Sequence, residues 1–181
     1  PQSVNAGTMK LALDEVGNGI NNTVAIDAMK PGDVQNRFIE LDNTGTLSGK
    51  NLTVRVAAGS DNKLSNDAVD GLQVALTSCS VAWTAAGVCA GDEAAVLAST
   101  PLSTLGTFTD TALTGTLPDP LFVRIAIALP EQGECNVDNA ASAQFEADCT
   151  TPLSGGSIQG LTNALSFTFK QTQQVAETTN S

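Results

Sequence analysis

The chain has 181 residues, of which 41% are hydrophobic, 15% charged and 4% aromatic, and it contains neither His nor Tyr. This length suits one domain with a buried core, while the net charge of −11 disfavours binding to nucleic acid phosphates and anionic lipid headgroups. No apolar run approaches the roughly 18 residues of a membrane span. We expect a single domain over residues 1–181, and the start "PQSVNAGTMKLAL", without a basic and apolar leader, is expected for a mature product.

Five segments alternate apolar and polar residues with the two-residue period of a half-buried strand. The apolar positions of each segment, such as Leu52, Val54 and Val56, should face the core, and the alternate positions are mostly polar. We therefore predict β-strands, in chain order, at TMKLAL (8–13), NLTVRVA (51–57), GLQVALTS (71–78), LFVRIAIAL (121–129) and NALSFTFKQ (163–171).

Turn signals separate these segments at spacings typical of β-sandwiches. They are GNG (17–19), KPGD (30–33), NTG (43–45), PDP (118–120) and SGG (154–156). Helix is limited to short turns in SNDAVDG (65–71) and TPLSTLG (100–106), and no repeat or linker divides the chain. The predicted fold is all-β, a jelly-roll-like antiparallel β-sandwich with a few short helical turns in its loops.

The four cysteines, Cys79, Cys89, Cys135 and Cys149, allow three pairings, and none of their spacings is that of a zinc or redox motif. We expect the local pairs Cys79–Cys89 and Cys135–Cys149, because each pair brackets a loop-like insertion. Closing each loop would stabilise the fold by about 2–3 kcal/mol. Disulfides indicate an extracellular location, and four reduced buried thiols are the alternative.

The absence of His removes the usual general base and excludes H-E-x-x-H zinc sites and Ser-His-Asp triads. A carboxylate pair could support glycoside cleavage, but nothing distinguishes one pair among the nineteen acids. Trp83 lies inside the first cysteine loop, where we expect it to pack against the disulfide rather than stack on a sugar. We predict no catalytic residue, no cofactor and no metal site.

Two acidic loops supply the carboxylate oxygens that calcium prefers, although neither matches a calcium loop. For the first loop the alternative is a solvated turn that caps a short helix through Ser65 or Asn66. The acids are Asp61, Asp67 and Asp70 in the first loop and Asp138, Glu146 and Asp148 in the second.

Three separated segments together resemble a known family: NAGTMKLAL (5–13), VAIDAMKPGDVQNRFIELDNTGTLSGKNLTV (24–54) and LSFTFKQTQ (165–173). Their order and rough spacing are similar to the TasA and camelysin family of secreted Gram-positive proteins. That family begins with a small-residue, Gly, Thr, Leu strand, continues with a Leu-Lys-Pro-Gly-Asp turn and a strand ending Asn-x-Gly-x-Leu, and closes on Phe-x-Phe-x-Ala-Thr-Gln. Here Met9 and Met29 stand where Leu is usual, and residues 59–157, which hold both cysteine pairs, lie outside the resemblance.

The KPGD segment is expected to act as a turn and to carry no chemistry. Pro31 presets φ, Gly32 permits a positive φ, and the Asp33 side chain can hydrogen-bond the backbone that follows. Ile39 and Leu41 should then enter the core.

The resemblance implies a jelly-roll subunit of extracellular filaments in a biofilm matrix or on a cell surface, with identical subunits as partners. The net charge and the lack of a long apolar run predict no nucleic acid partner and no membrane insertion. A monomeric cell-surface adhesive or ligand-binding module is the alternative. Camelysin relatives have been described as metalloproteases, but a chain without His offers no recognisable metal motif for that activity.

Assembly is expected to occur head-to-tail by donor-strand addition, in which one subunit completes a neighbour's sheet through main-chain hydrogen bonds. The N-terminal residues are the preferred donor: Pro1, Gln2, Ser3, Val4, Asn5 and Ala6. The C-terminal segment Gln173–Ser181 is the second choice, and a frayed N-terminus on a monomer is the alternative to both.

Overall fold

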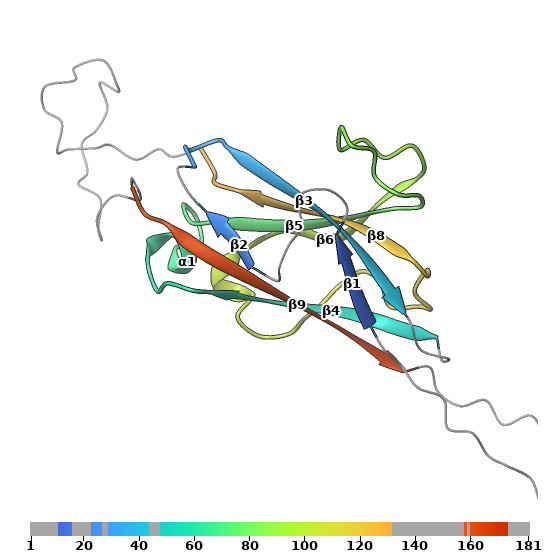
Figure 1. Cartoon of the computed structure of the whole chain (residues 1–181). Coiled ribbons are helices and arrows are strands. Elements are labelled where there is room, and N and C mark those ends of the chain that lie inside the picture. Colours follow the sequence, from blue (N-terminus) through green and yellow to red (C-terminus); the bar gives the residue numbers. More distant parts are fainter. Residues whose placement is uncertain are drawn as a thin grey trace, which may run out of the picture.

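A computed structural model describes residues 11–15, 23–26, 29–43, 48–131, 158 and 160–173. The described chain forms nine strands and two short helices. Figure 1 shows how most of them are arranged. The strands are β1 (Leu11–Glu15), β2 (Thr23–Ile26), β3 (Val34–Asn43), β4 (Gly49–Ala58), β5 (Gln73–Cys79), β6 (Glu93–Pro101), β7 (Thr109–Asp110), β8 (Leu121–Ala128) and β9 (Asn163–Gln173). Helix α1 spans Lys63–Asn66 and the 3₁₀ helix η1 spans Leu102–Thr104. No helix in this described part is long and apolar enough to cross a membrane.

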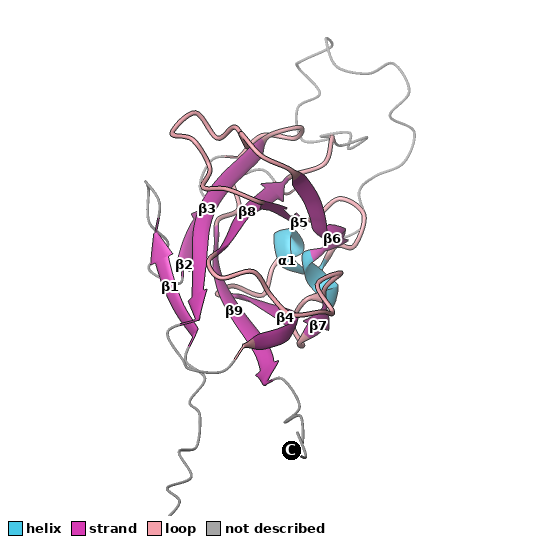
Figure 2. Cartoon of the chain, turned by 90° about the vertical axis from the view of Figure 1, so that its right-hand side faces the viewer, coloured by secondary structure: helices cyan, strands magenta, loops and turns pink. Residues whose placement is uncertain are grey.

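The strands form two antiparallel sheets that face each other as a sandwich (Figure 2). One sheet has the order β1-β3-β8-β5-β6 and the other has the order β2-β9-β4-β7. Strands β2 to β9 pair as the two arms of one long antiparallel hairpin would after rolling up on itself. The pairs, from the open end of this hairpin to its turn, are β2–β9, β3–β8, β4–β7 and β5–β6. This is the topology of a jelly roll, with β1 added beside β3, and it confirms the predicted fold class.

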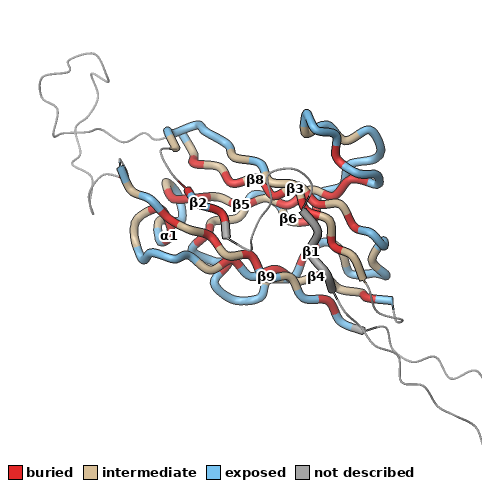
Figure 3. The backbone as a smooth tube through the Cα atoms, viewed as in Figure 1, coloured by how far each residue is buried: buried red, intermediate tan, exposed pale blue. Residues whose placement is uncertain are grey.

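The inward faces of the four predicted strands from residue 51 onward build the core, as the two-residue period indicates (Figure 3). Ile39 and Leu41 of β3 are buried as expected. The predicted inward positions of the other central strands are buried too: Leu52, Val54, Val56, Leu72, Val74, Leu76, Leu121, Val123, Ile125, Ile127, Leu129, Leu165 and Phe167. Within the predicted strand 8–13 the structure describes only the backbone of residues 11–13, as part of β1.

The sandwich has two ends, at which turns and loops connect the strands. The α1 end holds α1, Val34 at the start of β3 and Ala128 at the end of β8. The disulfide end holds Cys79, Asn43 and Leu11, and it lies opposite the α1 end in Figure 1. Because Leu11 pairs with Asn43, the N-terminal segment joins the sandwich at the disulfide end.

The KPGD turn lies at the α1 end and docks on the end of β8. Gly32 has a φ of +88°, the left-handed region that glycine adopts without strain. Its N–H donates to the Leu129 carbonyl (2.8 Å), and the Leu129 N–H donates to the Asp33 carbonyl (3.0 Å). The Asp33 side chain accepts from the preceding Lys30 N–H (2.7 Å), so the expectation that it bonds the following backbone is wrong.

Both predicted helical turns exist, one of them displaced. Helix α1 begins at Lys63, with Asn62 as its N-cap and Ser65 at the third helical position. The Asn62 N–H donates to the Ser65 hydroxyl (3.1 Å), which makes a capping box. Ser65 therefore takes part in the cap from the third helical position, whereas the N-cap itself is Asn62 and not Ser65 or Asn66. The second turn, η1, lies inside residues 100–106 as predicted.

Candidate functional site: an open edge on strand β3

One side of the sandwich has sheet edges that the chain itself covers. Strands β6 and β7 lie on this side, opposite β1 and β2 (Figure 2). The segment 105–117 runs along β4: the Val56 N–H donates to the Leu105 carbonyl (2.8 Å), the Leu52 N–H to the Leu113 carbonyl (2.9 Å) and the Leu117 N–H to the Gly49 carbonyl (2.9 Å). These bonds satisfy backbone groups of β4 beyond the two residues with which β7 pairs.

Strand β6 is blunted in a different way. Its pairing with β5 shifts register twice, and it ends at Pro101. The Ala112 N–H also donates to the Val96 carbonyl (2.8 Å). Bulges, a terminal proline and a covering loop are devices that keep a sheet edge from pairing with another chain.

The opposite side leaves part of β3 uncovered. Strand β1 pairs with Ile39–Asn43, whereas β8 pairs with Val34–Leu41. Among the described residues, Val34–Phe38 therefore pairs on one side only, and we call this segment the open edge. It lies at the α1 end, directly beyond Glu15 of β1.

The direction of the backbone groups on the open edge follows from the KPGD turn. The Leu129 N–H donates to the Asp33 carbonyl, so odd-numbered residues of β3 direct their backbone groups toward β8. Val34, Asn36 and Phe38 consequently direct their N–H and C=O groups away from the sheet. The Asn36 carbonyl accepts from Nη1 of Arg37 (2.9 Å). Such an edge is a template for an added strand.

The inward face of the open edge is polar. Gln35 lies opposite Ile127 and Arg37 opposite Ile125, both of which are core residues, so these two side chains are on the core face. The Gln35 Oε1 atom is buried without a hydrogen-bond partner in the structure. On the outward face, Val34 is 54% exposed.

A second uncovered stretch lies on β9. Strand β2 pairs with Asn163–Ser166, and β4 pairs with β9 as far as Gln173. Among the described residues, Phe167–Gln173 thus pairs with β4 alone. This stretch lies at the disulfide end, the end at which Leu11 joins the sandwich. Gln171 is buried there, and its Nε2 has no partner.

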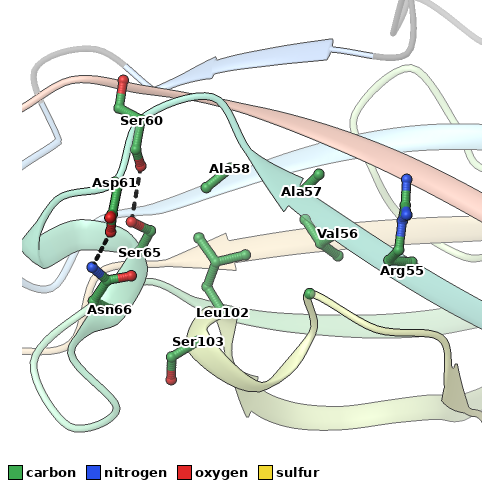
Figure 4. Close-up of a pocket in the computed structure, with 11 residues that line it drawn as sticks. Arg55, Val56, Ala57, Ala58, Ser60, Asp61, Ser65, Asn66, Leu102 and Ser103 are labelled. Carbon is green, nitrogen blue, oxygen red and sulfur yellow. Dashed lines mark hydrogen bonds between the residues drawn. The ribbon is translucent and has the colours of Figure 1, made fainter.

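A shallow pocket of about 320 Å³ lies between the end of β4, α1 and η1 (Figure 4). Leu102 lines it, Arg55 lies at one end, and Asp61 accepts a hydrogen bond from the Asn66 amide at the other. The Ser65 hydroxyl donates within the same loop. These residues can bind a small polar molecule, but they include no nucleophile with an adjacent base.

The acidic loop 61–70 is held by its own hydrogen bonds. The N–H groups of Asp70 and Val69 donate to Asp67 Oδ1, each at 2.9 Å, and hold the pKa of the Asp67 carboxyl below its ordinary 3.8. No cluster suited to a metal ion occurs among the residues that the structure describes. The second acidic loop, with Asp138, Glu146 and Asp148, lies outside them.

Cys79 and Cys89 form a disulfide with a Cα–Cα distance of 5.8 Å, the first of the two predicted pairs. Trp83 within this loop is buried on the outer face of the β3 sheet, where its ring lies 5.4 Å from that of Phe38. Cys135, Cys149 and the predicted donor residues Pro1, Gln2, Ser3, Val4, Asn5 and Ala6 all lie outside the described residues.

The predicted strands did not indicate the open edge, although a signal for it exists in the sequence. Counting back in twos from Ile39 and Leu41 reaches Arg37 and Gln35, so a predicted core face ends in polar residues. Comparison of the chain with protein-family models gives no match, and comparison with curated proteins gives none either.

Proposed function

We propose that this chain is a structural subunit of a homopolymeric extracellular filament. The observation that carries the proposal is the open edge Val34–Phe38, which pairs with β8 only, on a molecule whose opposite edges are covered by its own chain. An unpaired edge favours strand addition from another chain. The donor is the N-terminal segment Pro1–Ala6 of the next subunit.

The positions of the two ends support an open polymer. The donor segment is attached at the disulfide end through Leu11, whereas the open edge lies at the α1 end. A donor that leaves one end and pairs at the other end of its neighbour makes a head-to-tail contact, which repeats without closing. Pairing with the uncovered stretch of β9, at the donor's own end, would instead favour a closed two-fold dimer.

The polarity of the strands is compatible with this arrangement. Strand β1 is antiparallel to β3 and ends at Glu15, opposite Ile39. In a head-to-tail stack, a donor that enters at the α1 end runs in the same direction as the acceptor's β1. The donor therefore continues the line of β1 and pairs antiparallel with Val34–Phe38.

Deleting Pro1–Ala6 tests the proposal. The intact chain should form filaments in negative-stain electron microscopy, and the deleted chain should remain a folded monomer by light scattering. Deleting Gln174–Ser181 is the matched control and should leave filaments unchanged. If the intact chain forms only closed dimers, the β9 stretch is the contact; if it stays monomeric at all concentrations, the filament function is wrong.

The pocket beside α1 is the observation that favours the second candidate function, a monomeric surface module that binds a small polar ligand. Its residues supply a guanidinium and hydroxyl groups. Arg55→Ala separates the two functions, because it alters the pocket and leaves the open edge untouched. Under the filament function this variant polymerises as the unaltered chain does.

A further inference from the structure

We propose that the open edge selects its donor strand by polarity, with Gln35 facing Asn5 of the incoming subunit and Val4 of that subunit facing outward. This inference rests on the filament function proposed above and assigns the face and register of the donor. A donor strand is ordinarily expected to direct its aliphatic residues toward the core of the acceptor. The proposed register does the opposite, because it directs Val4 outward.

The starting observation is the amide of Gln35. Its Oε1 is buried on the core face of β3 without a hydrogen-bond donor among the described residues. A buried acceptor without a partner is destabilising. A donor strand placed beside the open edge sets one of its own side chains directly opposite Gln35 and on the same face.

The two faces of the donor differ in what they offer to that position. One face carries Gln2, Val4 and Ala6, and the other carries Pro1, Ser3 and Asn5. With Val4 opposite Gln35, an aliphatic group would seal the amide oxygen from any donor. With Asn5 opposite Gln35, the Asn5 amide N–H can donate to Oε1, and Ser3 lies opposite Arg37.

The same register suits the outward face. Val4 then lies opposite Asn36 and diagonal to Val34 and Phe38. Val34 is 54% exposed, and Phe38 packs on Trp83. Val4 therefore lies between the two apolar residues on the outward face of the open edge. The pairing also uses the whole open edge, because Gln2–Ala6 and Val34–Phe38 have the same length.

Main-chain bonding agrees with this register. Asn36 directs its N–H and C=O groups toward the open side, so Val4 opposite it can exchange both bonds. The residues from Ala6 to Leu11 then link the donor strand to its own subunit across at most about 18 Å. Neighbouring sandwiches must accordingly stack closely end to end.

Exchanging the polarity of the two donor faces tests the inference. Asn5→Leu should raise the critical concentration for filament formation about tenfold, because a buried amide acceptor stays unpaired. Val4→Asn is the matched control, since it changes an outward residue, and it should polymerise within about twofold of the unaltered chain. Adding Gln35→Leu to Asn5→Leu should restore assembly, because both facing side chains are then apolar.

The opposite pattern, with Val4→Asn disruptive and Asn5→Leu neutral, overturns the assignment, and so does equal assembly of all variants. A synthetic peptide Pro1–Gly7 added to the chain lacking residues 1–6 separates this inference from the filament function. Peptide binding that is weakened by Asn5→Leu and not by Val4→Asn supports the assignment even if the intact chain never polymerises. Absence of both filaments and peptide binding rejects both proposals.

Discussion

The guanidinium of Arg124 lies over the indole ring of Trp83, with Cζ 4.9 Å from the ring centroid. Arg124 is on β8, and Trp83 is on the loop that Cys79 and Cys89 close. The contact joins the disulfide loop to the outer face of the β3 sheet. Gly87 of the same loop approaches Phe38 so closely that a Cβ would lie 2.8 Å from the ring. The loop is thus part of the packed structure and not a free insertion.

Replacing Trp83 with alanine should destabilise the protein by about 3 kcal/mol, because Trp83 is only 4% exposed and removal of a buried aromatic ring leaves a cavity. The measurement is the free energy of unfolding in urea. Val88→Ala in the same loop is the control, since Val88 is 58% exposed and its loss should cost less than about 0.5 kcal/mol. Equal stability of both variants would show that the loop does not pack on the sheet in solution.

Both predicted disulfides should be found by peptide mapping under non-reducing conditions. The structure joins Cys79 to Cys89, which leaves Cys135 and Cys149 for each other. A fragment that joins Cys79 to Cys135 or Cys149 contradicts this pairing. The double variant C79S/C89S should lose about 2–3 kcal/mol of stability, from the entropy of the loop that the bond closes.

Asp67 should make folding sensitive to acid. Its pKa is lower in the folded protein than the ordinary 3.8, because the N–H groups of Asp70 and Val69 stabilise the carboxylate. The resulting stabilisation is present above pH 3.8 and is lost as the pH falls through the folded value. Asp67→Asn should therefore flatten the dependence of stability on pH in this window. A pH profile identical to that of the unaltered chain argues against these two hydrogen bonds.

The sequence predicts the central strands β4, β5, β8 and β9 and part of the edge strand β1, but not the edge strands β2, β6 and β7, for a physical reason. Central strands such as β5 and β8 bury one full face, so every second residue must be apolar. In β6 only Val96 is fully buried, and two register shifts interrupt the alternation, so no period marks that strand. Strand β2 is too short for a period to appear.

The open edge could not be predicted from local pattern alone. Its existence depends on where β1 stops against β3, and that is decided by pairing between segments far apart in the chain. Every second residue of β3 lies on the same face, so Gln35 and Arg37 share a face with the buried residues Ile39 and Leu41. The sequence therefore does contain a signal, which is two polar residues at core-facing positions. An inward charge of this kind is one way in which proteins keep an edge from pairing indiscriminately.

Arg37→Ala should accelerate filament formation. Nη1 of Arg37 donates to the Asn36 carbonyl at 2.9 Å, and this carbonyl faces the open side where an incoming strand needs it. The guanidinium competes with the donor N–H for this carbonyl. One exposed hydrogen bond contributes about 1 kcal/mol, so its removal should speed assembly about fivefold.

The assembly rate of Arg37→Ala is measured by light scattering, with electron microscopy of the products. Arg55→Ala is the matched control, because it removes the same charge from the outer face of β4 and should leave the rate unchanged. Slower assembly of Arg37→Ala would mean that the guanidinium holds the donor instead of guarding the edge. Amorphous aggregates in place of filaments would mean that the charge also excludes unrelated strands, since an edge without an inward charge pairs less selectively.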